Sequence, residues 1–231
     1  MSAMTIIEMF AKTGLTINEA QEKQFQTLFE FMVEYNKNVN LTSITEFEDV
    51  ILKHFIDSVL PFSMLGISGK ETFIDVGTGA GFPALPLLIY YPGLKGTLCD
   101  SLAKRCTYLE LVCEKIGIEA EIVHARSEEL GRVRREKYDI ASARAVAAMP
   151  VLTEFCLPFV KAGGRFIALK SVNEDINAAI NAIKTLGGEL ERTEDYKLPN
   201  GDSRRLVVVK KISQTPTKYP RSYANITKKP L

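Results

Sequence analysis

From Thr72 onward, short apolar runs alternate with segments that have the apolar spacing of helices. We expect strands at residues 73–76, 96–100, 121–124, 138–143 and 164–170. Strands that alternate with helices along a sequence pack into a parallel sheet with helices on both faces. The expected fold is therefore α/β and Rossmann-like.

The end of this region follows a different pattern. Residues 189–198 and 205–212 have the composition of strands, and the turn residues Asn200-Gly201-Asp202 lie between them. This arrangement is typical of an antiparallel hairpin. A mostly parallel sheet that ends in such a hairpin is the class I methyltransferase variant of the Rossmann architecture, an analogy at the level of fold alone.

The first 66 residues are expected to form a helical extension. Thr16-Ile17-Asn18-Glu19 and Thr45-Glu46-Phe47-Glu48 both have the capping-box pattern that begins a helix. The apolar residues after each box recur at helical spacing: Phe25, Leu28, Phe29, Met32 and Val33, then Val50, Ile51, Phe55 and Val59. With 231 residues, we divide the chain into a helical extension (1–66), a cofactor-binding core (67–213) and a basic tail (214–231).

The first expected strand runs into the glycine loop Asp75-Val76-Gly77-Thr78-Gly79-Ala80-Gly81. Open α/β sheets bind ligands at the carboxyl ends of their strands, and glycines let a ligand approach the backbone. A similar loop occurs in NAD enzymes, so the glycines alone do not name the cofactor. Asp75 suits a cationic sulfonium and amino group, and Pro83 removes an amide that a phosphate would use. The loop therefore favours S-adenosylmethionine, with Asp75, Gly77, Gly79 and Gly81 as candidate contacts.

Two further acidic positions follow the next strands. Asp100 ends the second strand, the usual place for a carboxylate that accepts hydrogen bonds from ribose hydroxyls. Taken alone, Asp100 would also serve as a helix N-cap. Ser127 and Glu128 follow the third strand, where an adenine edge would lie, although acids in the first turn of a helix explain them nearly as well.

Charged residues also stand at the ends of the fourth and fifth strands. Arg144 ends the fourth strand, and a charged group there is expected to orient the cofactor or a substrate or to pair with an acid. Lys170 has the same place on the fifth strand and carries a weaker argument. His54 and Asp57 are three residues apart on a helix and are expected to form a structural hydrogen-bonded pair.

The charge is unevenly distributed. The net charge is +1, but residues 203–231 contain no acidic residue and eight basic ones: Arg204, Arg205, Lys210, Lys211, Lys218, Arg221, Lys228 and Lys229. A basic end of this kind suggests a polyanionic partner, and the alternative is a solvated tail that aids solubility.

The four cysteines form no pair with metal-ligand spacing, so we expect free thiols, no metal site and a cytoplasmic protein. The longest apolar stretch, residues 82–92, is too short to span a bilayer, so we expect no membrane segment. We also expect a monomer.

Motifs along nearly the whole chain resemble the RsmG (GidB) family of 16S ribosomal RNA guanine-N7 methyltransferases. The matching segments are Asn40-Leu41-Thr42, His54-x-x-Asp57-Ser58, the glycine loop with Phe82-Pro83, Asp100-Ser101-Leu102-x-Lys104-Arg105, Ala143 to Ala147, Tyr219-Pro220-Arg221 and Lys229-Pro230-Leu231. Together these motifs are far more specific than the glycine loop alone.

The resemblance implies methyl transfer to a guanine in the decoding region of the small ribosomal subunit. It implies cofactor contacts at Gly77, Phe82, Asp100, Ser101, Leu102, Ser127, Glu128 and Arg144. We further expect Arg144 to have the catalytic role of orienting the reactants, and Arg204, Arg205, Arg221, Lys228 and Lys229 to hold RNA phosphates. An NAD(P)-dependent oxidoreductase and a non-catalytic RNA-binding protein with a vestigial pocket remain the alternatives.

Overall fold

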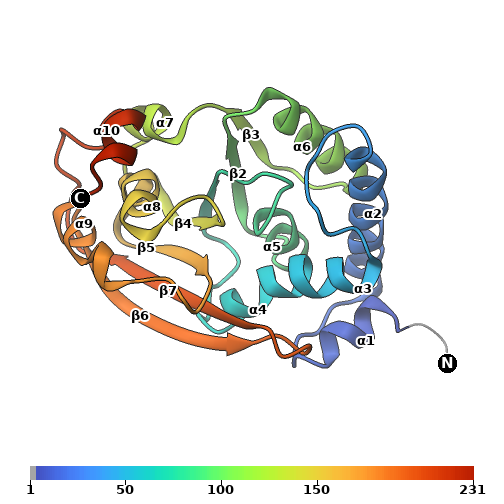
Figure 1. The fold of residues 1–231 in the computed structure, drawn as a ribbon. Coiled ribbons are helices and arrows are strands. Elements are labelled where there is room, and N and C mark those ends of the chain that lie inside the picture. The colour runs from blue at the N-terminus through green and yellow to red at the C-terminus, as the bar shows by residue number, and fades with distance from the viewer. Residues whose placement is uncertain (1–3) are drawn as a thin grey trace.

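The computed structural model describes residues 4–231, which form a seven-stranded sheet of order β3-β2-β1-β4-β5-β7-β6 (Figure 1). The first five strands are parallel, and β7 is antiparallel to both β5 and β6. The strands are β1 (Thr72–Val76), β2 (Lys95–Asp100), β3 (Glu121–His124), β4 (Tyr138–Arg144), β5 (Val160–Lys170), β6 (Gly188–Lys197) and β7 (Ser203–Lys211). The predicted α/β fold with a closing hairpin is confirmed.

Ten α-helices surround the sheet in the described part of the chain. They are α1 (Ile6–Ala11), α2 (Glu19–Asn36), α3 (Phe47–Val50), α4 (Asp57–Ser63), α5 (Ala84–Tyr90), α6 (Ala103–Ile116), α7 (Ser127–Val133), α8 (Met149–Cys156), α9 (Ile180–Thr185) and α10 (Tyr223–Lys228). A π-helical segment, Ile51–Ile56, joins α3 to α4, and short 3₁₀ turns lie at Leu157–Phe159 and Asn177–Ala179.

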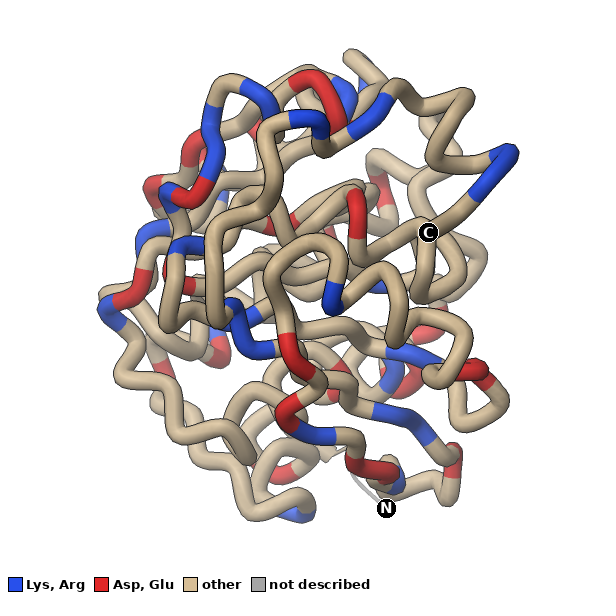
Figure 2. Tube along the Cα trace, turned by 90° about the vertical axis from the view of Figure 1, so that its left-hand side faces the viewer, with Lys and Arg blue, Asp and Glu red and all other residues tan. Residues whose placement is uncertain are grey.

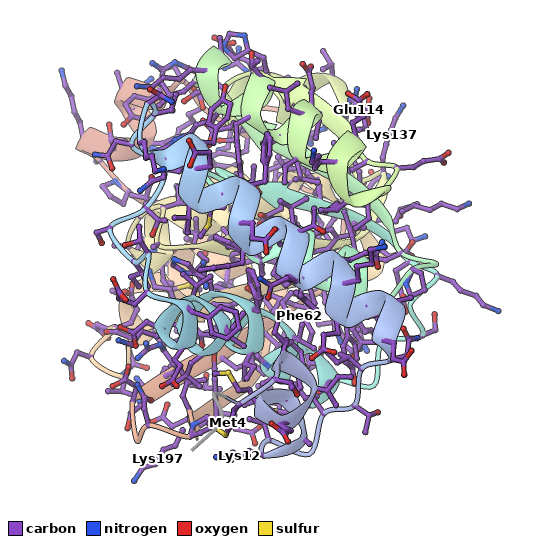
Figure 3. All side chains as sticks on the ribbon, turned by 90° about the vertical axis from the view of Figure 1, so that its right-hand side faces the viewer. Met4, Lys12, Phe62, Glu114, Lys137 and Lys197 are labelled. Carbon is purple, nitrogen blue, oxygen red and sulfur yellow. The ribbon has the colours of Figure 1, made fainter. Side chains whose placement is uncertain are left out.

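The sheet separates two hydrophobic cores, because side chains alternate between the faces of a strand. Phe73 of β1 packs in one core with residues of α2, α5 and α6. Its neighbour Ile74 packs in the other core with residues of α7, α8, α9 and α10. The N-terminal helices therefore share a continuous core with one face of the sheet, and α2 runs obliquely across the outside of that face (Figure 3).

The N-terminal helices do not begin where the capping patterns predicted. Asn18, and not Thr16, caps α2: its side chain accepts from Gln21 N at 2.9 Å, and Gln21 Oε1 accepts from Asn18 N at 3.0 Å. This reciprocal pair satisfies the orphan amides of Asn18 and Gln21, in the way that the predicted box would have satisfied those of Thr16 and Glu19. The second prediction is also wrong, since Glu46 stands at the N-cap of α3 and makes no side-chain cap hydrogen bond.

The C-terminal tail is folded onto the protein. Tyr219 and Ile226 are buried, and Arg221 forms an ion pair of 2.6 Å with Glu154 of α8. The helix α10 lies beside α7 and α8 (Figure 1). On the side of the molecule that carries the C-terminus, basic and acidic residues are interspersed (Figure 2). The tail is therefore attached to the rest of the protein through Tyr219, Arg221 and Ile226.

Candidate cofactor and substrate site

The glycine loop turns sharply after β1. Gly77 has φ +69°, and a Cβ there would lie 2.8 Å from Val146 Cγ2. Gly81 has φ +90°, and its Cβ would lie 2.3 Å from Leu85 Cδ1. At Gly79, by contrast, the nearest side-chain atom to such a Cβ is at 4.0 Å. Packing thus requires glycine at positions 77 and 81. At position 79 the space next to the backbone is open.

Asp75 lies behind the loop. Its side chain is fully buried, and Oδ1 accepts a hydrogen bond of 2.7 Å from Ser142 Oγ, whereas Oδ2 has no partner among the described residues. Burial raises the pKa of Asp75 to about 6, because a carboxylate is poorly stabilised away from water. Asp75 therefore supports the floor of the loop and does not line the cavity described next.

A cavity of about 230 Å³, here called the loop cavity, opens at the carboxyl ends of β1, β2 and β3. Five predicted residues line it: Gly77, Asp100, Ser101, Ser127 and Glu128. Asp100 is buried, with Oδ2 accepting from Gly79 N and Oδ1 from Leu102 N, each at 2.9 Å. The carboxylate of Asp100 thus joins the glycine loop to the turn after β2.

Sequence reasoning missed part of the loop cavity. Its remaining walls include Arg126, Val146, Val151, Phe155, Tyr223 and Thr227. The first two follow expected strands and were within reach of a pattern argument. Tyr223 and Thr227 belong to α10, and no motif in the sequence signals that the tail returns to this cavity.

Other predicted cofactor residues lie outside the lining of the loop cavity. Gly79, Gly81 and Asp75 are in the loop itself, and Leu102 is 43% exposed beside Asp100. The buried ring of Phe82 stacks on the His54 ring at 4.5 Å between centroids. Phe82 therefore faces the N-terminal helices.

A second cavity of about 480 Å³, here called the arginine cavity, contains Arg144. Its lining is Ile44, Lys53, His54, Asp57, Arg144, Ala145, Leu169, Lys170, Ser171, Glu174 and Arg204. Arg144 donates to Lys53 O at 3.2 Å and to His54 Nδ1 at 3.3 Å, and lies 3.6 Å from Asp57 Oδ2. Its Cζ is 5.2 Å from the centroid of the Phe82 ring.

The predicted direct pair of His54 with Asp57 is wrong. No hydrogen bond joins them among the described contacts, and Arg144 contacts both instead. The π-helical winding of Ile51–Ile56 changes the spacing, so residues three apart no longer stack as in an α-helix. Asp57 instead accepts from Tyr196 Oη at 2.9 Å, and burial raises its pKa.

His54 is held as a neutral ring. Burial, with a smaller contribution from the charge of Arg144, lowers the pKa of His54 to about 3. Because Arg144 donates to Nδ1, the proton sits on Nε2, which faces Thr42 Oγ1 at 2.9 Å. Both ring nitrogens of His54 are therefore occupied by hydrogen bonds.

The segment after β4 separates the two cavities. Arg144 and Ala145 line the arginine cavity, whereas Val146 and Ala147 line the loop cavity. Ala145 has φ +55°, a left-handed conformation that is unusual for a residue with a Cβ. This strained turn directs successive residues of one short segment into different cavities.

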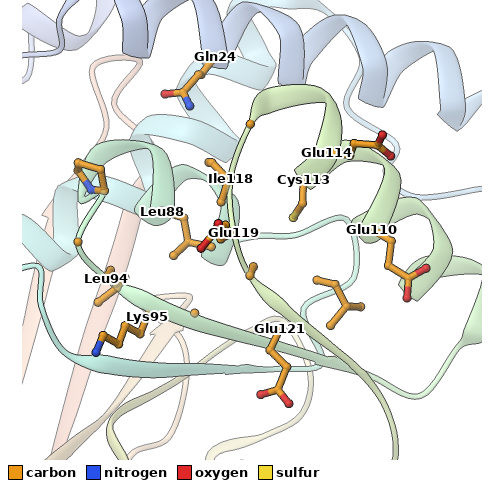
Figure 4. Close-up of a pocket in the computed structure, with 16 residues that line it drawn as sticks. Gln24, Leu88, Leu94, Lys95, Glu110, Cys113, Glu114, Ile118, Glu119 and Glu121 are labelled. Atoms are coloured by element: carbon orange, nitrogen blue, oxygen red, sulfur yellow. The ribbon is translucent and has the colours of Figure 1, made fainter.

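Another large hollow lies elsewhere. It measures about 1090 Å³ and is lined around the amino end of β2 and the end of α6, with Glu110, Glu114, Glu119 and Glu121 among its side chains (Figure 4). Ligands of open α/β sheets bind at the carboxyl ends of the strands, and carboxylates repel RNA phosphates. This hollow is therefore not the candidate site.

The predicted RNA-binding residues differ in their surroundings. Arg204 pairs with Asp57 and Asp202, Arg205 with Asp195, and Arg221 with Glu154. Lys228 and Lys229 are exposed, and neither forms an ion pair with any residue of 4–231. Lys228, the last residue of α10, and Lys229 after it are thus the most accessible cations of this group.

Two features are absent from residues 4–231. No group of three His, Cys, Asp or Glu residues among them is placed to hold a metal ion. None of their helices is long and apolar enough to cross a membrane.

Several solved structures with the same fold are named as methyltransferases. A putative methyltransferase from Bacillus halodurans superposes with a TM-score of 0.54 at 15% identity, covering 68% of this chain and 99% of that one. A precorrin-6y C5,15-methyltransferase from Geobacter metallireducens gives 0.52 at 12% identity, covering 67% and 87%. The fold is that of a class I methyltransferase.

Sequence relatives identify the family. Residues 21–206 match the family model described as rRNA small subunit methyltransferase G. Proteins named ribosomal RNA small subunit methyltransferase G are 46% identical in Lactobacillus acidophilus (98% of this chain, 97% of the relative) and 44% identical in Staphylococcus epidermidis (100% and 99%). The chain belongs to the rRNA small subunit methyltransferase G family. This membership decides against an NAD(P)-dependent oxidoreductase.

Proposed function

We propose that this protein transfers a methyl group from S-adenosylmethionine to N7 of a guanine in the decoding region of 16S ribosomal RNA. Support comes from the name that its relatives share and from the two cavities beside the glycine loop. The observation that carries the proposal is the segment from Arg144 to Ala147, which contributes to both cavities. A cofactor in one and a base in the other would meet at this segment.

The loop cavity fits the adenosine part of the cofactor. Asp100 offers a buried carboxylate for ribose hydroxyls, and Glu128 is a second buried acid in the same lining. Carboxylates accept the hydrogen bonds that hydroxyl and amino groups donate. When bound, S-adenosylmethionine supplies an electrophilic methyl group on a sulfonium. The task of Asp100 and the glycine loop is to hold that group in place.

The arginine cavity fits a base of a polyanion. Four of its side chains are cationic and two are anionic, a balance that favours a nucleic acid. Each of its ionisable side chains has a polar partner: Lys53 contacts Asp49, His54 contacts Thr42, Asp57 contacts Tyr196, Arg144 contacts Lys53 O, Lys170 contacts Glu174, and Arg204 contacts Asp202. Arg144 lines this cavity and not the loop cavity. We therefore assign it the role of orienting the base, and not the cofactor.

Guanine N7 needs no general base, because it carries a lone pair in the ring plane and no proton. A site whose buried groups are all engaged in hydrogen bonds is adequate for this chemistry, in which positioning accounts for the rate. The product base is cationic, and the carboxylates of Asp57 and Glu174 would stabilise the developing charge.

RNA phosphates would contact the basic residues Arg204, Arg205, Arg221, Lys228 and Lys229. Lys228 and Lys229 are the strongest candidates, because the other three already have acidic partners. Four buried free cysteines agree with a reducing cytoplasm, where we place the protein, and we propose that it acts as a monomer on the small subunit.

The assignment of the two cavities is tested by two variants. Transfer of a tritiated methyl group to small-subunit RNA is measured together with calorimetric binding of S-adenosylhomocysteine. Asp100→Ala should lose both, whereas Arg144→Lys should lose most of the transfer and keep the affinity for S-adenosylhomocysteine, since lysine lacks the planar fork of arginine. Equal loss of cofactor affinity in both variants would contradict the assignment of Arg144 to the base.

A further inference from the structure

One face of α10 points into the loop cavity. Tyr223 and Thr227 lie one helical turn apart and both line that cavity, and Thr227 Oγ1 donates to Tyr223 O at 2.9 Å. The remaining lining comes from β1, β2 and the segments after β3 and β4, together with α8. Residues from the last nine positions of the chain thus complete a cavity that the sheet begins.

The ring of Tyr223 has two neighbours that present flat groups. It stacks on Phe155, with 6.0 Å between centroids and 7° between the ring planes. The guanidinium of Arg126 lies 4.9 Å from the centroid of the same ring. Tyr223 is nevertheless 48% exposed, so much of its surface is free to contact a ligand.

The helix α10 is held firmly in this place. Ile226 is fully buried, and Arg221 is joined to Glu154, whose side chain is fully buried. Arg132 of α7 donates to Pro220 O at 3.3 Å. These contacts fix the position of α10 relative to α7 and α8.

We propose that α10 is a wall of the cofactor site and that Tyr223 contacts the adenine base of the cofactor. This inference rests on the proposed function. Tyr223 lines the cavity together with Arg126, Ser127 and Glu128, the residues that follow β3. The apolar side chains Val151 and Phe155 belong to the same lining, and a purine ring matches such a wall better than the charged methionine part does. The tail, besides any role with RNA, then serves cofactor binding directly.

Calorimetry without RNA tests the proposal with two ligands, S-adenosylhomocysteine and 5′-methylthioadenosine, which lacks the amino-acid part. Loss of an aromatic–base contact predicts that Tyr223→Ala raises Kd about tenfold for both ligands. Tyr223→Phe keeps the ring and should stay close to the wild-type Kd. The matched control is Asn225→Ala, an exposed position of α10 that does not line the cavity, for which no change is expected.

Each other outcome has a definite meaning. An unchanged Kd for Tyr223→Ala, with wild-type protein that binds S-adenosylhomocysteine, would overturn the wall and leave the proposed function intact. A weaker affinity for S-adenosylhomocysteine alone would also overturn it, because Tyr223 would then contact the amino-acid part. Wild-type protein that binds neither ligand would instead refute the proposed function itself.

Discussion

Gly77 shows how closely single residues of the loop are packed. Its φ of +69° costs any other L-residue about 1–2 kcal/mol, and a Cβ at this position would overlap Val146 Cγ2. We expect Gly77→Ala to lower the free energy of unfolding by more than this strain alone, as measured by urea denaturation. Adding Val146→Ala should restore the part that is due to the overlap.

Gly79→Ala is the matched control for this series. It has a similar φ of +62° but open space around its Cβ, so only the backbone strain should appear. Rescue of Gly79→Ala by Val146→Ala, or no rescue of Gly77→Ala, would show that the loop is not packed as described.

The protonation of His54 is a second test at this scale. The unfolded chain binds a proton at this ring below about pH 6.5, whereas the folded protein does so only near pH 3. The unfolded state therefore binds more protons between these values, and the contribution of neutral His54 to stability is lost as the pH falls through them.

We expect the NMR signals of the His54 ring to stay constant from pH 8 to pH 5. The chain has only two histidines, so a His124→Gln variant leaves a single ring to follow. A titration midpoint near 6.5 would mean that the ring is solvated and that its contact with Arg144 does not form.

Residues were predictable from the sequence where the backbone alone determines their position. Gly77 and Asp100 meet in one cavity because parallel strands end at the same edge of a sheet. The place of Asp75 was not predictable, because whether a strand-end acid faces a ligand or a neighbouring strand depends on Ser142, 67 residues away.

At the scale of elements, two cations, the half-buried Arg221 and the buried Lys211, hold the tail region in different ways. Arg221 pairs with Glu154, which has no exposed side-chain surface. Lys211 is also fully buried, and burial lowers its pKa to about 8, while its partner Glu136 remains 19% exposed. Removing a cation is costly only where it leaves a buried carboxylate without compensation.

We therefore expect Arg221→Met to weaken the attachment of α10 by about 3 kcal/mol. Hydrogen exchange at the amides of residues 223–228 measures this directly. Lys211→Met should leave that exchange unchanged, because Glu136 is 19% exposed and water can solvate its carboxylate once the lysine is gone. Equal effects of the two substitutions would contradict the different roles of these ion pairs.

The strands were predictable at this scale because each combines an apolar run with a clear boundary. The place of α10 was not, since it depends on a contact between Arg221 and Glu154 that no local pattern reveals. The start of α2 was predicted two residues early, because Thr16 and Asn18 are both good caps and Gln21 decides between them.

At the scale of the whole molecule, the sheet, the N-terminal helices and the tail each contribute to one end of the protein. The N-terminal helices supply His54 and Asp57 to the arginine cavity, the hairpin supplies Arg204, and α10 supplies Tyr223 to the loop cavity. A cofactor fold common to many methyltransferases is thus bordered by the two parts of the chain that lie outside it. These additions are where we expect specificity for RNA to reside.

The most direct test of the central claim is to map methylated guanines in small ribosomal subunits treated with this protein and labelled S-adenosylmethionine. Mass spectrometry of nuclease fragments locates the methyl group, and cleavage specific for 7-methylguanine identifies its position on the base. We predict one 7-methylguanine in the decoding region of 16S ribosomal RNA, absent with Asp100→Ala protein. A methyl group on another base or another atom, or no transfer by wild-type protein that binds the cofactor, would contradict it.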